Sequence, residues 1–257
     1  MFLNQNKASG EVKIDLNCDM GESFGRYRLG NDEAIMPFIS SANIACGLHA
    51  GDPLVMRQTV RLAKQHGVAV GAHPGWPDLQ GFGRREMSLA SDEVEAFVLY
   101  QIGALSAFAK AEDVELHHVK PHGALYNQAA KDRNLANAIA RAVKQFSVDL
   151  ILVGLAGSGL VEAGVEAGLK VANEGFPDRN YNPDGTLISR KLAGAVIESP
   201  EEVAANAIRL AREGIDFSRQ RIRIDTLCLH GDNPHAVQNA KLARDALEKA
   251  GIKIAAL

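Results

Sequence analysis

Three polar side chains recur at every second position of an otherwise apolar segment near the N-terminus: Asp15, Asn17 and Asp19. In an extended strand, side chains two positions apart share a face and lie about 6.6 Å apart. An unpaired carboxylate facing a layer of helices would be costly or would take up a proton. We therefore expect this face to line the interior or mouth of a barrel, with at least one carboxylate functional. The alternative is that Asp15 pairs with a core lysine and Asp19 caps a loop.

A second alternating set is His118, Lys120 and His122, in which Pro121 interrupts the strand. Two imidazoles and an amine on one face can orient a carbonyl, transfer protons or ligate a metal. We expect burial among imidazoles to lower the pKa of Lys120, which would suit a general base. A histidine with a purely structural role is the alternative for each imidazole.

Imidazoles also occur where other predicted strands end, at His49, His73 and His230. Together with His122 they are candidate ligands of a divalent metal, because imidazole and carboxylate groups are common zinc and iron ligands. No HExxH, HxH or CxxC spacing is present, so the sequence leaves open whether a metal is required. Asp52 directly precedes a proline and fits a helix N-cap as well as a site residue.

Arginines follow two of the predicted strands, in segments rich in glycine, proline and aspartate. Arginine binds carboxylates through two parallel hydrogen bonds, so these segments are candidates for holding an anionic substrate. Solvated surface arginines are the alternative. The candidate substrate-binding residues are Arg84, Arg85, Asp178, Arg179 and Asp232.

Short apolar segments that must position these groups alternate with helical patterns along the chain. The predicted strands are Val12–Asp19, Ala42–Gly47, Ala69–His73, His117–Lys120, Asp149–Gly154, Lys170–Glu174 and Thr226–His230. Such alternation favours a parallel sheet covered by helices. Polar residues, Glu174 among them, gather at six of the strand ends, and a β/α barrel brings catalytic groups together in this way. We predict an α/β fold with a single distorted, seven-stranded β/α barrel; an open doubly wound sheet is the alternative.

Length and composition are those of a globular protein: 257 residues, 46% hydrophobic and 23% charged. We expect one domain over residues 1–257, with residues 1–11 a poorly ordered extension. The net charge of −3 argues against binding of nucleic acid. No apolar run approaches the roughly 20 residues that span a bilayer, and the first residues lack a secretory signal, so we expect a cytoplasmic protein without membrane association. The three cysteines form no CxxC pair and are expected to be reduced.

Seven ordered motifs resemble the LamB/YcsF family. They are DLNCDMGESFG (15–25), SANIACGLHAGDP (41–53), GAHPGWPDLQGFGRR (71–85), VKPHGALYN (119–127), LVGLAGS (152–158), FPDRNYNPDGTLISR (176–190) and CLHGD (228–232). The resemblance extends from about residue 12 to the C-terminus. It implies a distorted β/α barrel related to the glycoside hydrolase/deacetylase superfamily.

The resemblance also implies an enzyme, an ATP-dependent hydrolase of a cyclic amide. The implied reaction is cleavage of 5-oxo-L-proline to L-glutamate coupled to ATP hydrolysis, performed with partner subunits B and C. On this hypothesis Arg84, Arg85 or Arg179 holds the substrate carboxylate, and His118 and His122 bind the reacting oxygen. Asp15 or Glu174 acts as base.

Two further functions remain open at this point. A stand-alone metal-dependent amidohydrolase or deacetylase would use the imidazoles to activate water. A non-catalytic subunit would bind the lactam and present it to a partner. The sequence does not decide which subunit holds ATP, or whether the chain forms a homo-oligomer.

Overall fold

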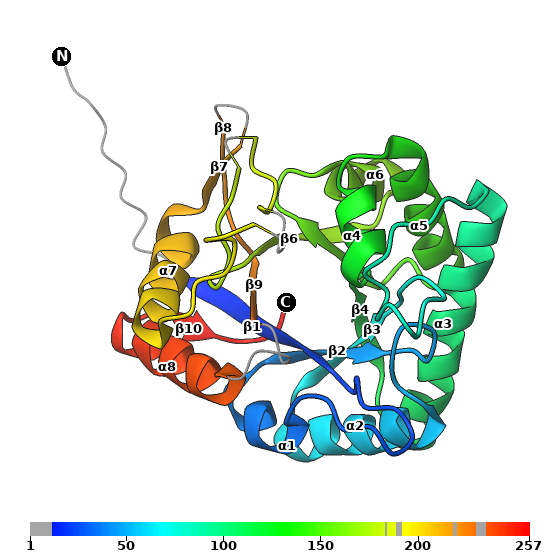
Figure 1. Cartoon of the computed structure of the whole chain (residues 1–257), viewed down its shortest axis with the longest axis horizontal. Coiled ribbons are helices and arrows are strands. Elements are labelled where there is room, and N and C mark those ends of the chain that lie inside the picture. The colour runs from blue at the N-terminus through cyan, green and yellow to red at the C-terminus, as the bar shows by residue number, and fades with distance from the viewer. Residues whose placement is uncertain (1–11, 183, 189–191, 218–219, 230–234) are drawn as a thin grey trace.

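Seven parallel strands form a closed barrel, as predicted (Figure 1). The structure is a computed structural model that describes residues 12–182, 184–188, 192–217, 220–229 and 235–257. Each strand of the barrel pairs with the next, and the last pairs with the first, placing Asn17 opposite Cys228. The strands are β1 (Lys13–Met20), β2 (Ser41–Ala45), β3 (Ala69–His73), β4 (Leu116–Val119), β5 (Ile151–Leu155), β6 (Lys170–Gly175) and β9 (Thr226–Leu229).

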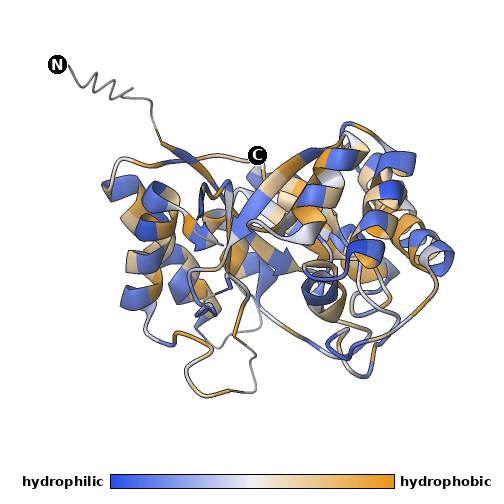
Figure 2. Ribbon diagram, turned by 90° about the horizontal axis from the view of Figure 1, so that it is seen from above, coloured by the Kyte–Doolittle hydropathy of each residue, from blue (hydrophilic) through white to orange (hydrophobic). Residues whose placement is uncertain are grey.

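Helices surround the barrel and bury one face each against it (Figure 1). In α5, the buried residues Ala136, Ile139, Ala140 and Val143 recur at the helical spacing that forms one apolar stripe. Figure 2 shows hydrophobic and hydrophilic residues alternating along these helices. The helices are α1 (Asp32–Ile35), the 3₁₀ helix η1 (Met36–Phe38), α2 (Pro53–His66), α3 (Ser91–Ala111), α4 (Gly123–Ala129), α5 (Arg133–Phe146), α6 (Gly159–Ala167), α7 (Pro200–Glu213) and α8 (Ala236–Lys249).

Asp52 is the N-cap of α2. Its Oδ1 accepts hydrogen bonds from the backbone N–H groups of Leu54 and Val55, at 2.8 and 3.0 Å, and its Oδ2 accepts one from Gly25 at 2.7 Å. Asp52 therefore starts the helix and ties the loop after β1 to it. This confirms the capping alternative for this residue.

The long helix α3 is apolar enough to cross a membrane by length and composition alone, which holds for no other helix in the described part of the chain. Its side chains at Val94, Val98, Ile102 and Leu105 are instead buried against the barrel and its neighbouring helices. This packing accounts for the apolar side chains on the inner face of α3.

Three short strands do not follow from the sequence patterns. β7 (Ile215–Phe217) and β8 (Gln220–Ile222) form an antiparallel hairpin outside the barrel, and β10 (Lys253–Ile254) pairs with the first residues of β1. Each has two or three residues, too few for a periodic pattern to emerge. Residues 1–11, for which the sequence predicts a poorly ordered extension, lie outside the described part of the chain.

Candidate active site

The ammonium group of Lys120 lies within a buried polar network inside the barrel, near the carboxyl ends of the strands. Its Nζ is 2.8 Å from Glu174 Oε1 and 3.0 Å from Asp19 Oδ1. It also donates to Cys228 Sγ at 3.0 Å and to Asn17 Oδ1 at 3.3 Å. Lys120 is 2% exposed and Glu174 is 0% exposed. Two carboxylates therefore share one buried cation.

The environment keeps Lys120 protonated. Burial acts to lower its pKa, but the negative charges of Asp19 and Glu174, with the neighbouring Cys228, outweigh burial and raise the pKa well above its usual value. The expectation that this pKa is lowered is wrong, because carboxylates rather than imidazoles surround the amine. Lys120 is thus a fixed cation and hydrogen-bond donor and not a general base.

Amide and phenol groups fix the two carboxylates. Asn17 Nδ2 donates to Glu174 Oε1 at 3.0 Å, and Tyr126 donates to Glu174 Oε2 at 2.7 Å. Asn43 Nδ2 donates to Asp19 Oδ1 at 2.9 Å and to Asn17 Oδ1 at 2.7 Å. Burial, and next the charge of Glu174, raise the pKa of Tyr126 well above its usual value, so the phenol stays protonated. Both oxygens of Glu174 are therefore held by donors.

His118 lies beside this network. Its Nε2 is 2.7 Å from Asn43 Oδ1, which requires Nε2 to carry the proton if the amide oxygen accepts. Burial, followed by the nearby His117 and Lys120, lowers the pKa of His118 to about 3, so the ring is neutral. The ring needs the space above Gly71, where a β-carbon would come within 2.1 Å of Nε2.

A second cluster joins three imidazoles and one carboxylate: Glu22, His49, His73 and His122, all buried. His73 Nε2 is 3.0 Å from His122 Nδ1, and Glu22 Oε1 is 3.6 Å from both His49 Nε2 and His122 Nδ1. The rings of His49 and His122 are stacked, with their centroids 3.8 Å apart. His73 Nε2 also lies 3.3 Å from Asp19 Oδ2, so Asp19 connects this cluster with the Lys120 network.

Burial keeps two imidazoles of this cluster, His49 and His122, neutral. It is the main cause that lowers the pKa of His49 well below its usual value, and the other imidazoles act in the same direction. Burial, with His73 next, lowers the pKa of His122 to about 3. Neutral imidazole is the form that ligates metals.

Glycines in the loop after β3 make room for these rings. A β-carbon at Gly75 would lie 2.6 Å from His49 Nδ1. One at Gly83 would lie 2.8 Å from His49 Cβ and 2.9 Å from His122 Cδ2, and Gly83 also has a φ of +62°. The loop can close over the imidazoles because these two positions lack side chains.

Asp15 lies deeper, toward the amino ends of the strands, and is linked to the Lys120 network by the Thr226 hydroxyl, which accepts a hydrogen bond from Asn17 Nδ2 at 2.6 Å. Its carboxylate accepts hydrogen bonds from the hydroxyls of Ser40, Ser41 and Thr226, at 2.6, 2.7 and 2.6 Å. Burial raises its pKa, and the hydroxyl donors act against this. Asp15 shares the inward face with Asn17 as expected, but it pairs with hydroxyl groups instead of a core lysine.

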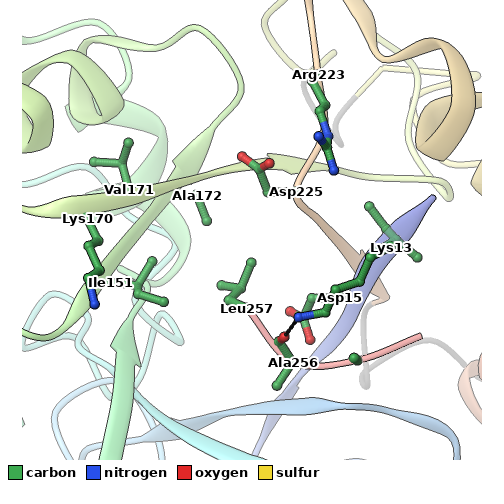
Figure 3. Close-up of a pocket in the computed structure, with 12 residues that line it drawn as sticks. Lys13, Asp15, Ile151, Lys170, Val171, Ala172, Arg223, Asp225, Ala256 and Leu257 are labelled. Carbon is green, nitrogen blue, oxygen red and sulfur yellow. Dashed lines mark hydrogen bonds between the residues drawn. The ribbon is translucent and has the colours of Figure 1, made fainter. Parts of the chain in front are cut away.

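Asp15 also lines a cavity of about 320 Å³ at the amino end of the barrel (Figure 3). Lys170, Arg223 and Asp225 lie around it, together with the last residues of the chain. Because β1 is eight residues long, this cavity and the Lys120 network open toward opposite ends of the barrel. Asp15 is therefore not placed beside the imidazoles.

The predicted substrate-binding residues are placed in three different ways. Arg85 pairs with the buried Asp78 through its Nε, 2.9 Å from Oδ1, and the Arg84 guanidinium lies 4.9 Å from the centre of the Phe82 ring. Arg179 is 7% exposed and donates to the backbone oxygens of Ala195 and Ile188, so it stabilises its own loop. Asp178 is buried beside it. His230 and Asp232 lie outside the described residues.

Four residues of the two clusters were not singled out from the sequence: Glu22, Asn43, Tyr126 and Cys228. Asn43 is an amide in the middle of the apolar strand β2, and this alone is a signal, because buried amides need hydrogen-bond partners. Glu22 lies two residues after the end of β1, and the other predicted site residues also lie near strand ends. Tyr126 lies four residues after His122 on one helical turn.

Comparisons with known proteins agree with this architecture. The LamB/YcsF family profile matches residues 14–257. The A subunit of 5-oxoprolinase from Pyrococcus horikoshii is 56% identical over 247 residues, 95% of this chain and 97% of the relative. The protein of the same name from Bacillus licheniformis is 56% identical over 248 residues, 95% of this chain and 98% of the relative. The crystal structure of a lactam utilization protein from Thermus thermophilus has 53% identity and a TM-score of 0.89, covering 95% of this chain and 100% of that one.

Proposed function

Since the chain belongs to the LamB/YcsF family, we propose that it is the A subunit of an ATP-dependent 5-oxoprolinase. The observation that carries this proposal is the 56% identity, over nearly the full length of both chains, to relatives that bear this name. The complex contains partner subunits B and C and converts 5-oxo-L-proline to L-glutamate at the expense of ATP. Because the reaction consumes ATP, we expect it to take place in the cytoplasm.

The chemistry explains why ATP is needed. A five-membered lactam is an unactivated amide with a poor leaving group. Transfer of the γ-phosphoryl group to the lactam oxygen releases ADP and makes the ring carbon more electrophilic. Water then adds to that carbon, the C–N bond breaks while the nitrogen takes up a proton, and a second water releases phosphate. The protein has to hold the substrate, position the water and stabilise the developing negative charge.

The Lys120 network supplies groups for these tasks. Lys120 is a preorganised cation whose hydrogen bonds are directed by Asp19 and Glu174, and such fixed charges stabilise anionic transition states. Asp19 is partly exposed, with 12% of its side chain accessible, and is the carboxylate we assign as the base toward water. Glu174 and Asp15 are only 0% and 2% exposed, so we assign them as supports for the site.

The cationic side chain of Arg84 is our candidate for the substrate carboxylate. It is exposed in the loop that covers the imidazoles, and its guanidinium lies 4.9 Å from the centre of the Phe82 ring. Arg85 pairs with the buried Asp78, and Arg179 is itself buried and donates to backbone oxygens of its own loop. We therefore assign these two arginines to loop structure.

The test is reconstitution of the complex from this chain and purified B and C subunits. We expect glutamate and ADP to form in equal amounts from 5-oxo-L-proline and ATP when all three proteins are present. Asp19→Asn should lower turnover at least tenfold. The matched control is Asp113→Asn, an exposed aspartate in the loop after α3, and it should leave turnover unchanged.

Other outcomes would favour the other functions. Glutamate formed without ATP or partners would indicate a stand-alone amidohydrolase. Binding of the lactam together with full turnover of Asp19→Asn in the complex would indicate a subunit that only presents the substrate.

A further inference from the structure

We propose that Glu22, His49, His73 and His122 hold one divalent transition-metal ion, with Zn²⁺ the best match to these ligands. One nitrogen from each histidine and one oxygen of Glu22 lie within 4.8 Å of one another, and all four residues are buried. The four residues come from the loop after β1, the loop after β2, the end of β3 and the residue before α4. Metal binding does not depend on the reaction proposed above and can be tested on this chain alone.

The hydrogen bonds of two histidines direct their free lone pairs toward one point. His73 Nδ1 lies 2.7 Å from the backbone oxygen of Lys120, and His122 Nε2 lies 2.9 Å from the backbone oxygen of Phe82. A carbonyl oxygen only accepts, so both of these nitrogens carry protons. In the neutral rings, His73 Nε2 and His122 Nδ1 then have lone pairs, and these two atoms are only 3.0 Å apart.

Two facing lone pairs at this distance repel unless a cation lies between them. A proton would turn one ring into an imidazolium in a buried site. A metal ion satisfies both nitrogens and keeps both rings neutral. Backbone carbonyls that fix the tautomer of ligating histidines are the usual outer partners of such sites.

His49 gives a second, independent indication. It is 0% exposed, and neither of its ring nitrogens has a hydrogen-bond partner among the described residues. Buried polar groups without partners are costly, and a bound ion would satisfy one of these nitrogens. Its Nε2 faces Glu22 Oε1 at 3.6 Å. Since its ring is stacked on His122 with an interplanar angle of 7°, we expect it to tilt when it joins the ion.

The ligand types favour a transition metal over Mg²⁺ or Ca²⁺, and the distances are compatible with one. With metal–ligand bonds of about 2.0–2.1 Å, the ligand atoms of a tetrahedral zinc site are roughly 3.3 Å apart. Three of the six pairs here are 3.0, 3.6 and 3.6 Å apart, and all six lie within 4.8 Å, so the ligands have to move only slightly to reach this geometry. Three imidazoles and one carboxylate also match zinc, cobalt or iron, whereas Mg²⁺ and Ca²⁺ prefer oxygen ligands.

The site adjoins the Lys120 network through Asp19, whose Oδ2 is 3.3 Å from His73 Nε2. An ion at this place can polarise a carbonyl oxygen or lower the pKa of a bound water. Asp19 would then accept a hydrogen bond from that water. The two clusters would form one continuous site, with the metal on one side of Asp19 and Lys120 on the other.

The experiment uses the purified full chain, stripped with a chelator and dialysed, and titrated with Zn²⁺ or Co²⁺ alone. We expect one equivalent to bind, and the absorption of the Co²⁺ form to show low-symmetry coordination by nitrogen. His122→Gln and His73→Gln should each weaken binding at least 100-fold, and Glu22→Gln at least tenfold. His117→Gln is the matched control, because this imidazole is adjacent to His118 but outside the cluster, and it should bind as the wild type does.

Circular dichroism of each variant establishes that it is folded before it is titrated. Less than 0.1 equivalent of bound Zn²⁺ and Co²⁺ in the folded wild type overturns the proposal, as does unchanged affinity in the folded His73 and His122 variants. Metal binding in a chain whose complex does not cleave 5-oxo-L-proline refutes the proposed function and leaves the metal site standing. A complex that cleaves 5-oxo-L-proline although its A chain binds no metal refutes the metal site and leaves the proposed function standing.

Discussion

Replacing Lys120 with methionine keeps the approximate length of the side chain and removes the cation between Asp19 and Glu174. Both carboxylates lie within 3.0 Å of Lys120 Nζ, so the variant leaves two buried or partly buried anions without their shared counter-ion. Removing one partner of a buried ion pair costs about 3–5 kcal/mol, and we expect the free energy of unfolding to fall by this amount. For a chain of 257 residues this corresponds to a fall in melting temperature of roughly 6–20 °C.

The pH dependence of this difference has a defined sign. The pKa of Lys120 is raised in the folded protein, because Asp19, Cys228 and Glu174 outweigh the opposing effect of burial. The stabilisation is therefore fully present below the unfolded-state pKa of about 10.4 and decreases as the pH rises above it. The difference in the free energy of unfolding between wild type and variant should stay constant from pH 7 to about pH 10 and decrease at higher pH.

Urea unfolding followed by circular dichroism measures both quantities. Lys241→Met is the matched control, because Lys241 is exposed on α8 and exposed charged side chains contribute little to stability. It should unfold as the wild type does. A loss below about 1 kcal/mol for Lys120→Met, as expected of a surface ion pair, would refute the assignment of Lys120 as a buried, shared cation.

Three further predictions concern other parts of the structure. Gly71→Ala should destabilise the protein by about 1–3 kcal/mol in thermal unfolding, because the new β-carbon would lie 2.1 Å from His118 Nε2; an unchanged melting temperature would place the ring elsewhere. Asp52→Ala should cost about 1 kcal/mol of stability at pH 7. Burial acts to raise the pKa of Asp52 but backbone N–H donors lower it overall, so this loss should begin to decrease as the pH falls below about 4, and a loss that does not decrease in more acidic solution would contradict the capping role. The cysteines should react with a thiol reagent only on unfolding, because burial raises the pKa of each, to about 12 for Cys46; rapid labelling of the native protein would contradict this. The thiols concerned are Cys18, Cys46 and Cys228.

The barrel was predictable because its strands are buried on both faces. β3, for example, is an uninterrupted run of small and apolar residues that ends in His73, and its bounds agree with the predicted Ala69–His73. The hairpin of β7 and β8 lies outside the barrel and carries the exposed, charged Arg221, so no apolar pattern distinguishes it from a loop.

Most residues of the site were predictable from the sequence, but their positions along the barrel axis and the protonation state of Lys120 were not. Period-two spacing places Asp15 and Asp19 on one face, yet four residues of strand separate them by about 13 Å, and the sequence does not show which of the two lies near the imidazoles. The sign of the pKa shift of Lys120 depends on Asp19 and Glu174, which are 101 and 54 positions away in the chain. Only the fold brings these charges together.

Local sequence patterns also did not predict which of the arginines are buried and which are exposed. Arg179 and Arg84 both occur in loops after strands. Arg179 is buried and donates to backbone oxygens, whereas Arg84 is exposed. Which of them can meet a substrate depends on how each loop closes. Residue type alone does not contain this information.

Pairing of β1 with β9 has a consequence for synthesis of the chain on the ribosome. Asn17 donates a hydrogen bond to Thr226, which is synthesised more than 200 residues later. Until β9 emerges, the backbone groups along one edge of β1 lack hydrogen-bond partners. The acidic side chains of β1 also lack the partners that β9 provides. Ring closure is thus a late, non-local event, and during translation the unfinished sheet is the form most exposed to aggregation and to capture by chaperones.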